Sequence, residues 1–216
     1  STLQLGTPVV ILASVTILVG SLIALTQDNL KRRLAFSTIA QLSYIILGAG
    51  LLSSQALTGG MIHIAMHAFG KITLFFAAGA ILVAANKTNI SDMGGLGRAM
   101  PVTFGAFLIG SLSIIGLPPF GGMWSKWYLA MGTLEAGQWL LLSVLLASSL
   151  LNIAYLLPVP VRAFFGKAVD GTVYTQVREA PASCLAAMII TSLACLVLFF
   201  YPEPFYQLAM TVAGAK

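Results

Sequence analysis

The chain of 216 residues is 58% hydrophobic and only 8% charged, and its formal net charge is +5. Because soluble domains carry about 25% charged residues, this composition excludes an ordinary soluble domain and predicts an all-α, polytopic transmembrane helical bundle. The few charges lie mainly in loops, where they bear on membrane topology, and we expect no nucleic-acid partner.

Apolar segments long enough to be membrane spans recur about seven times along the chain. The predicted helices cover residues 8–27, 34–52, 58–84, 101–116, 120–133, 138–161 and 182–201. Pro202 and Pro204 are expected to end the last of them. We expect these helices to form a single transmembrane domain over residues 1–216.

A short charged loop separates the first two predicted helices. It begins at Asp28 and contains three consecutive cations, Lys31, Arg32 and Arg33. The second helix then has a polar side, made of Ser37, Thr38, Gln41, Ser43 and Tyr44. These groups either form hydrogen bonds between helices or hold water beside a proton route.

The third predicted helix carries His63, His67 and Lys71. Their spacing of four residues places them on one helical stripe. Lys71 lies near the middle of the apolar run, more than about 15 Å from either end, so its side chain is too short to reach the interface. A charge at that depth costs roughly 2.5–3.5 kcal/mol or more. The lysine either pairs permanently with an acid of another helix or chain, or spends part of its time neutral and can exchange a proton.

The two histidines allow three interpretations. Together with Lys71 they predict a stepwise proton path through water, because histidine titrates near neutral pH. They could instead be neutral packing residues. A pair at i and i+4 can also share zinc, but Ile64 follows His63 where a zinc protease needs glutamate. No cysteine, aspartate or third histidine is near in the sequence, so we expect no metal and no cofactor.

A break interrupts the helical pattern between residues 101–116 and 120–133. It is formed by Pro118, Pro119, Gly121 and Gly122, which cannot continue a helix. The break is either a tight turn between two short helices or the middle of a discontinuous helix, which often marks an ion site.

Lys126, the second lysine inside an apolar segment, follows this break after Ser125. The neighbouring aromatic residues Trp124, Trp127 and Tyr128 are expected to make cation–π contacts with it or to form an interface belt.

Three motifs resemble a known family. They are DNLKRRLAFSTIAQ at residues 28–41, HIAMHAFGKITLF at 63–75 and GLPPFGGMWSK at 116–126. In this order they resemble the antiporter-like membrane subunits of respiratory complex I and of Mrp-type Na⁺/H⁺ antiporters. The runs KITLFF, KT and SKWY, which begin at residues 71, 87 and 125, are most similar to the D-type member of the Mrp set. Phe36 and Gly70 depart from the family pattern.

The resemblance implies about fourteen spanning helices in the whole subunit, built as two inverted repeats. This chain resembles the C-terminal half, with one repeat at about residues 33–165 and a final helix at 182–201. Its relay would consist of Lys71, Lys126, His63 and His67. Supporting polar groups would be Asp28, Lys31, Ser37, Thr38, Gln41 and Ser125.

The implied function is proton translocation within a multisubunit Na⁺/H⁺ antiporter. The alternative is a proton-pumping subunit of an NADH–quinone oxidoreductase, and a third possibility is a membrane-embedded enzyme or scaffold. The chain itself carries no catalytic motif. Its expected partners are other membrane subunits, lipid, H⁺ and Na⁺, in the cytoplasmic membrane of a bacterium.

If every predicted span crosses the membrane once, the side of the membrane on which each loop lies follows from the order of the spans. One side then holds six cations, Lys31, Arg32, Arg33, Lys87, Arg98 and Lys216, and the other holds three, Arg162, Lys167 and Arg178. The positive-inside rule makes the first side cytoplasmic.

Overall fold

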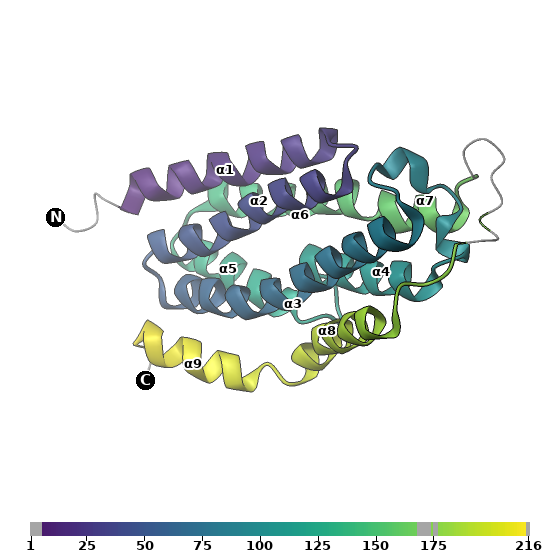
Figure 1. Ribbon diagram of the computed structural model, residues 1–216. Helices are drawn as coiled ribbons and strands as arrows, with labels where there is room; N and C mark the ends of the chain where they lie inside the picture. The colour runs from purple at the N-terminus through teal and green to yellow at the C-terminus, as the bar shows by residue number, and fades with distance from the viewer. Residues whose placement is uncertain (1–5, 168–173, 175–176, 215–216) are drawn as a thin grey trace.

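The computed structural model describes residues 6–167, 174 and 177–214. Within these residues the fold is an all-α bundle (Figure 1). The α-helices are α1 (Gly6–Thr26), α2 (Leu30–Gly50), α3 (Ser54–Ala85), α4 (Pro101–Ile115), α5 (Gly122–Glu135), α6 (Trp139–Leu156), α7 (Pro158–Phe165), α8 (Ala182–Phe200) and α9 (Glu203–Ala213). Two short 3₁₀ helices, η2 (Ile90–Met93) and η3 (Leu96–Arg98), lie between α3 and α4.

Local signals in the sequence fix the ends of the central helices. The side chain of Asn29 accepts a hydrogen bond from the backbone N–H of Arg32 at 3.1 Å and so caps the start of α2. Ser53 caps α3 in the same way, through the N–H of Ala56 at 3.1 Å. These side chains satisfy N–H groups that the first helical turn leaves without a partner. At the end of α3, Asn86 adopts the left-handed conformation that terminates a helix.

The 32-residue helix α3 is the centre of the bundle. It packs against α2, α4, α5, α8 and α9, while α1 covers α2 and α6. Glycines allow close approach: a Cβ atom on Gly59 would lie 2.6 Å from the backbone nitrogen of Leu129 on α5. The polar face of α3 is therefore enclosed on several sides by other helices, as small residues at helix contacts permit.

The prediction of about seven spans is confirmed in part. Among the described residues, four helical stretches are long and apolar enough to cross a membrane, and α4 is a shorter apolar helix. These stretches are α1, α3, the run of α6 and α7, and α8. The prediction that the last predicted helix ends at Pro202 and Pro204 is confirmed, because α8 ends at Phe200. The same prolines also stand at the start of a further helix that was not predicted, α9, where the missing N–H costs nothing.

Helices α4 and α5 lie one after the other along α3 (Figure 1). They have 15 and 14 residues, or about 22 Å each, and neither alone matches a hydrocarbon core of about 30 Å. Residues 116–121 separate them, as expected for the two arms of one discontinuous helix.

The predicted placement of Arg162, Lys167 and Arg178 on the side opposite to Lys31 and Arg98 is wrong, because α4 and α5 follow one another along the bundle. The segment between α3 and α4 meets α7, where the N–H of Gly95 donates to the carbonyl of Arg162 at 3.4 Å. The N–H of Val102 donates to the carboxylate of Glu179 at 2.6 Å. The loops that the sequence analysis assigned to opposite sides of the membrane therefore lie together at one end of the bundle. We call this the basic end; its cations are Lys31, Arg32, Arg33, Lys87, Arg98, Arg162, Lys167 and Arg178.

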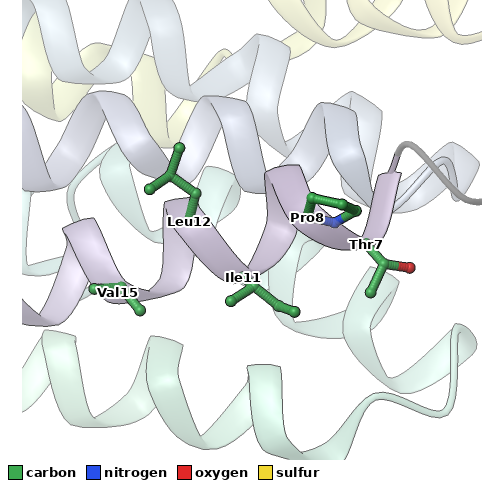
Figure 2. Close-up of a pocket in the computed structure, with 5 residues that line it drawn as sticks. All are labelled: Thr7, Pro8, Ile11, Leu12 and Val15. Carbon is green, nitrogen blue, oxygen red and sulfur yellow. The ribbon is translucent and has the colours of Figure 1, made fainter.

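The outer face of α1 is apolar. Figure 2 shows Thr7, Pro8, Ile11, Leu12 and Val15 around a shallow hollow there. Leu12 is 69% exposed, and the hollow contains no titratable side chain. This face has the character of a surface that meets lipid or another subunit, so the chemistry has to be sought inside the bundle.

Candidate functional site

Polar side chains from four helices meet inside the bundle. We call them the polar row, and they are Ser37, Gln41 and Tyr44 on α2, His63, His67 and Lys71 on α3, Ser125 and Lys126 on α5, and Ser149, Asn152 and Tyr155 on α6. Sequence reasoning singled out the α3 stripe, the polar side of the second helix and the pair Ser125 and Lys126. The structure brings these groups together and adds those of α6.

Lys71 is 5% exposed. Its ammonium group donates a hydrogen bond to Ser37 Oγ at 2.6 Å and another to the carbonyl oxygen of Leu34 at 3.2 Å. Both acceptors belong to α2, and no carboxylate of the described residues forms a salt bridge with this ammonium group. The interpretation of Lys71 as one half of a fixed ion pair therefore finds no partner among these residues. Both oxygens can accept from the ammonium, and the Ser37 hydroxyl can also donate to a free amine.

The two histidines form a stack that extends from Lys71 along α3. The ring centroids of His63 and His67 are 5.6 Å apart, and the ring of Tyr44 stacks on His63 at 5.5 Å. His63 Nδ1 and Ser125 Oγ are 2.9 Å apart and share a hydrogen bond. Ser125 directly precedes Lys126, so this hydrogen bond joins the α3 stripe to the helix that carries the second lysine.

Lys126 is held by the helix break. Its ammonium group donates to the carbonyl oxygen of Ile115 at 2.9 Å and to Ser149 Oγ at 3.1 Å. Ile115 is the last residue of α4, so its carbonyl has no partner within the helix and lies at the negative end of the helix dipole. The break thus provides an acceptor for a cation at this depth.

The chain forms the break through close contact between the two arms. Gly116 ends α4 with a φ of 88°, a conformation that favours glycine. A Cβ atom on Gly122 would lie 1.8 Å from the carbonyl oxygen of Ser113. The backbone N–H of Gly121 donates to the carbonyl of Cys195 on α8 at 2.9 Å. These contacts explain why two glycines follow Pro118 and Pro119 so closely.

A second line of polar groups follows α6. Ser37 Oγ lies 2.8 Å from the hydroxyl of Tyr155, which donates to Asn152 Oδ1. Ser149, one turn further along α6, accepts from Lys126. Spacing of three residues places Ser149, Asn152 and Tyr155 on one helical face. Polar side chains therefore lie between Lys71 and Lys126 on α3 and also on α6.

Six buried side-chain atoms of the described residues have no hydrogen-bond partner in the protein, and all belong to the polar row. They are both amide atoms of Gln41, the hydroxyl of Tyr44, Nε2 of His63, Nε2 of His67 and Nδ2 of Asn152. Buried polar atoms are nearly always satisfied, commonly by ordered water. Their concentration along one line is the pattern expected of a hydrated path.

The remaining predicted residues have different surroundings. Asp28 accepts hydrogen bonds from the N–H and the hydroxyl of Ser91, at 3.0 and 2.6 Å, and fixes the loop after α3. Lys31 is exposed at the start of α2. Thr38 donates to the carbonyl of Leu34 at 2.9 Å, a bond within its own helix. The structure does not bring these three side chains into the polar row.

The structure gives Lys126 an aromatic partner on another helix than the one considered for a cation–π contact. The alternative, an interface belt of Trp124, Trp127 and Tyr128, stays a prediction. Trp124 donates to the carbonyl of Phe199 at 2.9 Å, and Tyr128 stacks on Tyr206 of α9. The ring that faces the ammonium belongs to Tyr44, 5.3 Å away. Tyr44 lies three positions after Gln41 on the polar side of α2, so helical spacing could have indicated that it faces the site. No such signal in the sequence distinguishes Ser149 from the other serines of α6.

Comparisons with known proteins show which family this chain belongs to. A family model described as "NADH:quinone oxidoreductase/Mrp antiporter, TM" matches residues 2–152. NADH-quinone oxidoreductase subunit N of Desulforudis audaxviator is 39% identical over 202 residues, which are 89% of this chain and 40% of the relative. NADH-quinone oxidoreductase subunit L of Rickettsia bellii is 33% identical over 174 residues, which are 80% of this chain and 26% of the relative.

A solved structure of the Mrp complex from Dietzia sp. superimposes with a TM-score of 0.86 at 25% identity, covering 98% of this chain and 46% of that one. The chain thus spans less than half the length of the relatives that it matches. Since the family model covers well over half of the chain, this chain belongs to the NADH:quinone oxidoreductase/Mrp antiporter transmembrane family.

Proposed function

We propose that this chain is part of an antiporter-like membrane subunit that moves protons along the polar row. The observation that carries the proposal is the two sets of polar side chains that lie between the two lysines, His63 and His67 on α3 and Tyr155 and Asn152 on α6. A lysine bonded only to neutral oxygens can release a proton and later regain it without leaving a carboxylate unpaired.

The chemistry of the row suits stepwise transfer. A neutral imidazole can accept a proton on one ring nitrogen and release one from the other. Hydroxyl groups such as that of Ser37 both donate and accept, so they can pass a proton on while their hydrogen bonds rearrange. Water bound at the six unpartnered atoms would complete the line between the two ammonium groups.

For the parent complex we propose a proton-pumping arm of an NADH–quinone oxidoreductase, and the Mrp-type Na⁺/H⁺ antiporter becomes the second candidate. The two relatives described above are named as oxidoreductase subunits. This preference is the reverse of the one that the runs at residues 71 and 125 suggested, which was for the Mrp-type antiporter. The likeness to the Dietzia Mrp complex keeps the second candidate open.

The driving force distinguishes the two candidates. In sealed vesicles that contain the whole complex, NADH is expected to drive proton uptake in sodium-free buffer, as measured with a pH-sensitive dye. An antiporter would instead collapse an imposed pH gradient when sodium is added and would not respond to NADH. The second result would overturn our choice of complex, while proton movement in either assay supports the function of the row.

We further propose that α4 and α5 together cross the membrane once, and that residues 33–165 correspond to one of two inverted repeats in the whole subunit. Under the same proposal the basic end faces the cytoplasm of a bacterial cell, because at least eight Lys/Arg residues gather there.

Cysteine labelling checks this orientation. A cysteine introduced by Lys167→Cys, at an exposed position of the basic end, should react with an impermeant maleimide in inverted vesicles and be protected in intact cells. Glu135→Cys at the opposite end of α5 should show the reverse pattern. The same accessibility for both positions, or an exchange of the two patterns, would contradict the proposed topology.

A further inference from the structure

A crevice opens at the basic end, between the start of α2, η2 and α7. Its volume is about 500 Å³. Asp28, Arg33 and Arg162 line it together with apolar residues of α7. The crevice is distinct from the polar row, because none of the row's side chains lines it.

Arg33 forms the floor of this crevice. It is 9% exposed, unlike its neighbours Lys31 and Arg32, which are exposed. Its Nε donates to the carbonyl oxygen of Gln27 at 2.8 Å, and its Nη1 donates to the carbonyl oxygen of Tyr155 at 2.9 Å. The guanidinium therefore bridges the end of α1 and the end of α6 beneath an opening to the surface.

Tyr155, one of the two residues that Arg33 bridges, belongs to the polar row. Tyr155, whose carbonyl holds Arg33, presents its hydroxyl to Ser37, and Ser37 accepts from Lys71. Lys71 also bonds Leu34, the residue after Arg33. Arg33 thus lines the crevice and, through the carbonyl of Tyr155, also touches one of the residues of the polar row.

We propose that the crevice is the aqueous mouth of the polar row and that Arg33 is the positioning residue that closes it. This inference rests on the proposed function. The guanidinium remains charged at any physiological pH and prefers acceptors in a forked arrangement. Two carbonyls hold it over the row, and Asp28 in the same crevice is an alternative partner of opposite charge. Movement from Tyr155 towards Asp28 would open the mouth without breaking the helix contacts.

Accessibility of Ser37 tests the gate. Ser37→Cys is introduced into the whole protein, with Cys184 and other reactive cysteines replaced by serine, and its reaction with a small cationic methanethiosulfonate is followed in vesicles. A thiol scavenger in the opposite compartment restricts the reagent to one side. The reaction should be slow with Arg33 present and several-fold faster with Arg33→Ala, only when reagent is added at the basic end. Arg33→Lys, which keeps a donor but not the fork, should give a rate between the two.

Two controls separate gating from loosening of the fold. Arg162→Ala removes another cation of the crevice but leaves the bridge, so the rate should stay slow. Ser43→Cys probes a buried position of α2 that lies outside the polar row, and it should stay slow with or without Arg33.

The inference is overturned by equal rates at Ser37→Cys with Arg33 and with Arg33→Ala, by faster reaction at Ser43→Cys as well, or by reaction from the opposite side. Labelling is measured without ion flux. A negative labelling result would therefore refute the gate without refuting the transport function. A variant that no longer transports protons can still be labelled and interpreted.

Discussion

Replacing Lys71 with arginine is expected to abolish proton transport by the whole protein while the protein still assembles. Arginine keeps the positive charge and can still donate to Ser37 and Leu34, so a lysine that served only to bind helices would be replaced with little loss. A relay must release its proton, and the deprotonated fraction of arginine at neutral pH is below about one in 10⁵. Transport should therefore fall by at least about tenfold, a change of about 1.4 kcal/mol or more in the barrier.

The measurement is proton flux into vesicles, normalised to the amount of assembled complex. Lys71→Ala should also be inactive, because it removes the proton carrier altogether. Lys31→Arg is the matched control, since Lys31 is exposed at the start of α2 and outside the polar row; its flux should equal that of the unmodified protein. Normal flux in Lys71→Arg at normal assembly would show that Lys71 is a fixed charge and would refute the relay.

Gly122→Ala should destabilise the fold more than any other single added methyl group in the bundle core. The added Cβ would lie 1.8 Å from the carbonyl oxygen of Ser113, and that atom belongs to the backbone of α4, so no side-chain rotation relieves the clash. We expect α5 to move away from α4 at a cost of about 3 kcal/mol, the upper range for overpacking. Lys126 would then lose the carbonyl of Ile115, which is its acceptor at the break.

Thermal unfolding of the detergent-solubilised complex measures the effect, with proton flux as the second observable. Gly105→Ala is the control on α4, because nothing lies within 4 Å of its added Cβ; it should be neutral or should stabilise the helix by about 0.5–1 kcal/mol. If Gly122→Ala unfolded at the same temperature as Gly105→Ala, the two arms would not be in close contact at Ser113.

Local sequence was sufficient to predict most of the helices and the stripe of site residues on α3. Hydropathy predicted a membrane bundle, and helices α1 to α5 begin and end within a few residues of the predicted ranges, apart from the starts of α2 and α3. Spacing of four residues placed His63, His67 and Lys71 together, because neighbours at that spacing share a face of any α-helix. The prolines and glycines after Gly116 marked the break for an equally local reason, since they remove helical hydrogen bonds or permit positive φ.

Contacts between helices could not be predicted in this way. Arg33 looked like one of three equivalent loop cations, yet only it is buried, because the ends of α1 and α6 offer carbonyl acceptors there. Tyr44 faces Lys126 although 82 positions separate them in the chain numbering. No periodicity within a helix encodes which residue of another helix will lie opposite.

The sequence by itself determined the solvent, the helical class and the family of this chain, since each depends on composition or on short motifs. Only the tertiary structure decided that the predicted helices at residues 101–116 and 120–133 lie end to end instead of side by side. Because α4 and α5 follow one another along α3, the later loops return to the end that carries Lys31 and Arg98. The same packing brings the two lysines into one polar row and buries Arg33 against the carbonyls of Gln27 and Tyr155. It is fixed by close backbone approach at glycines and by carbonyls that the helix ends leave unpaired.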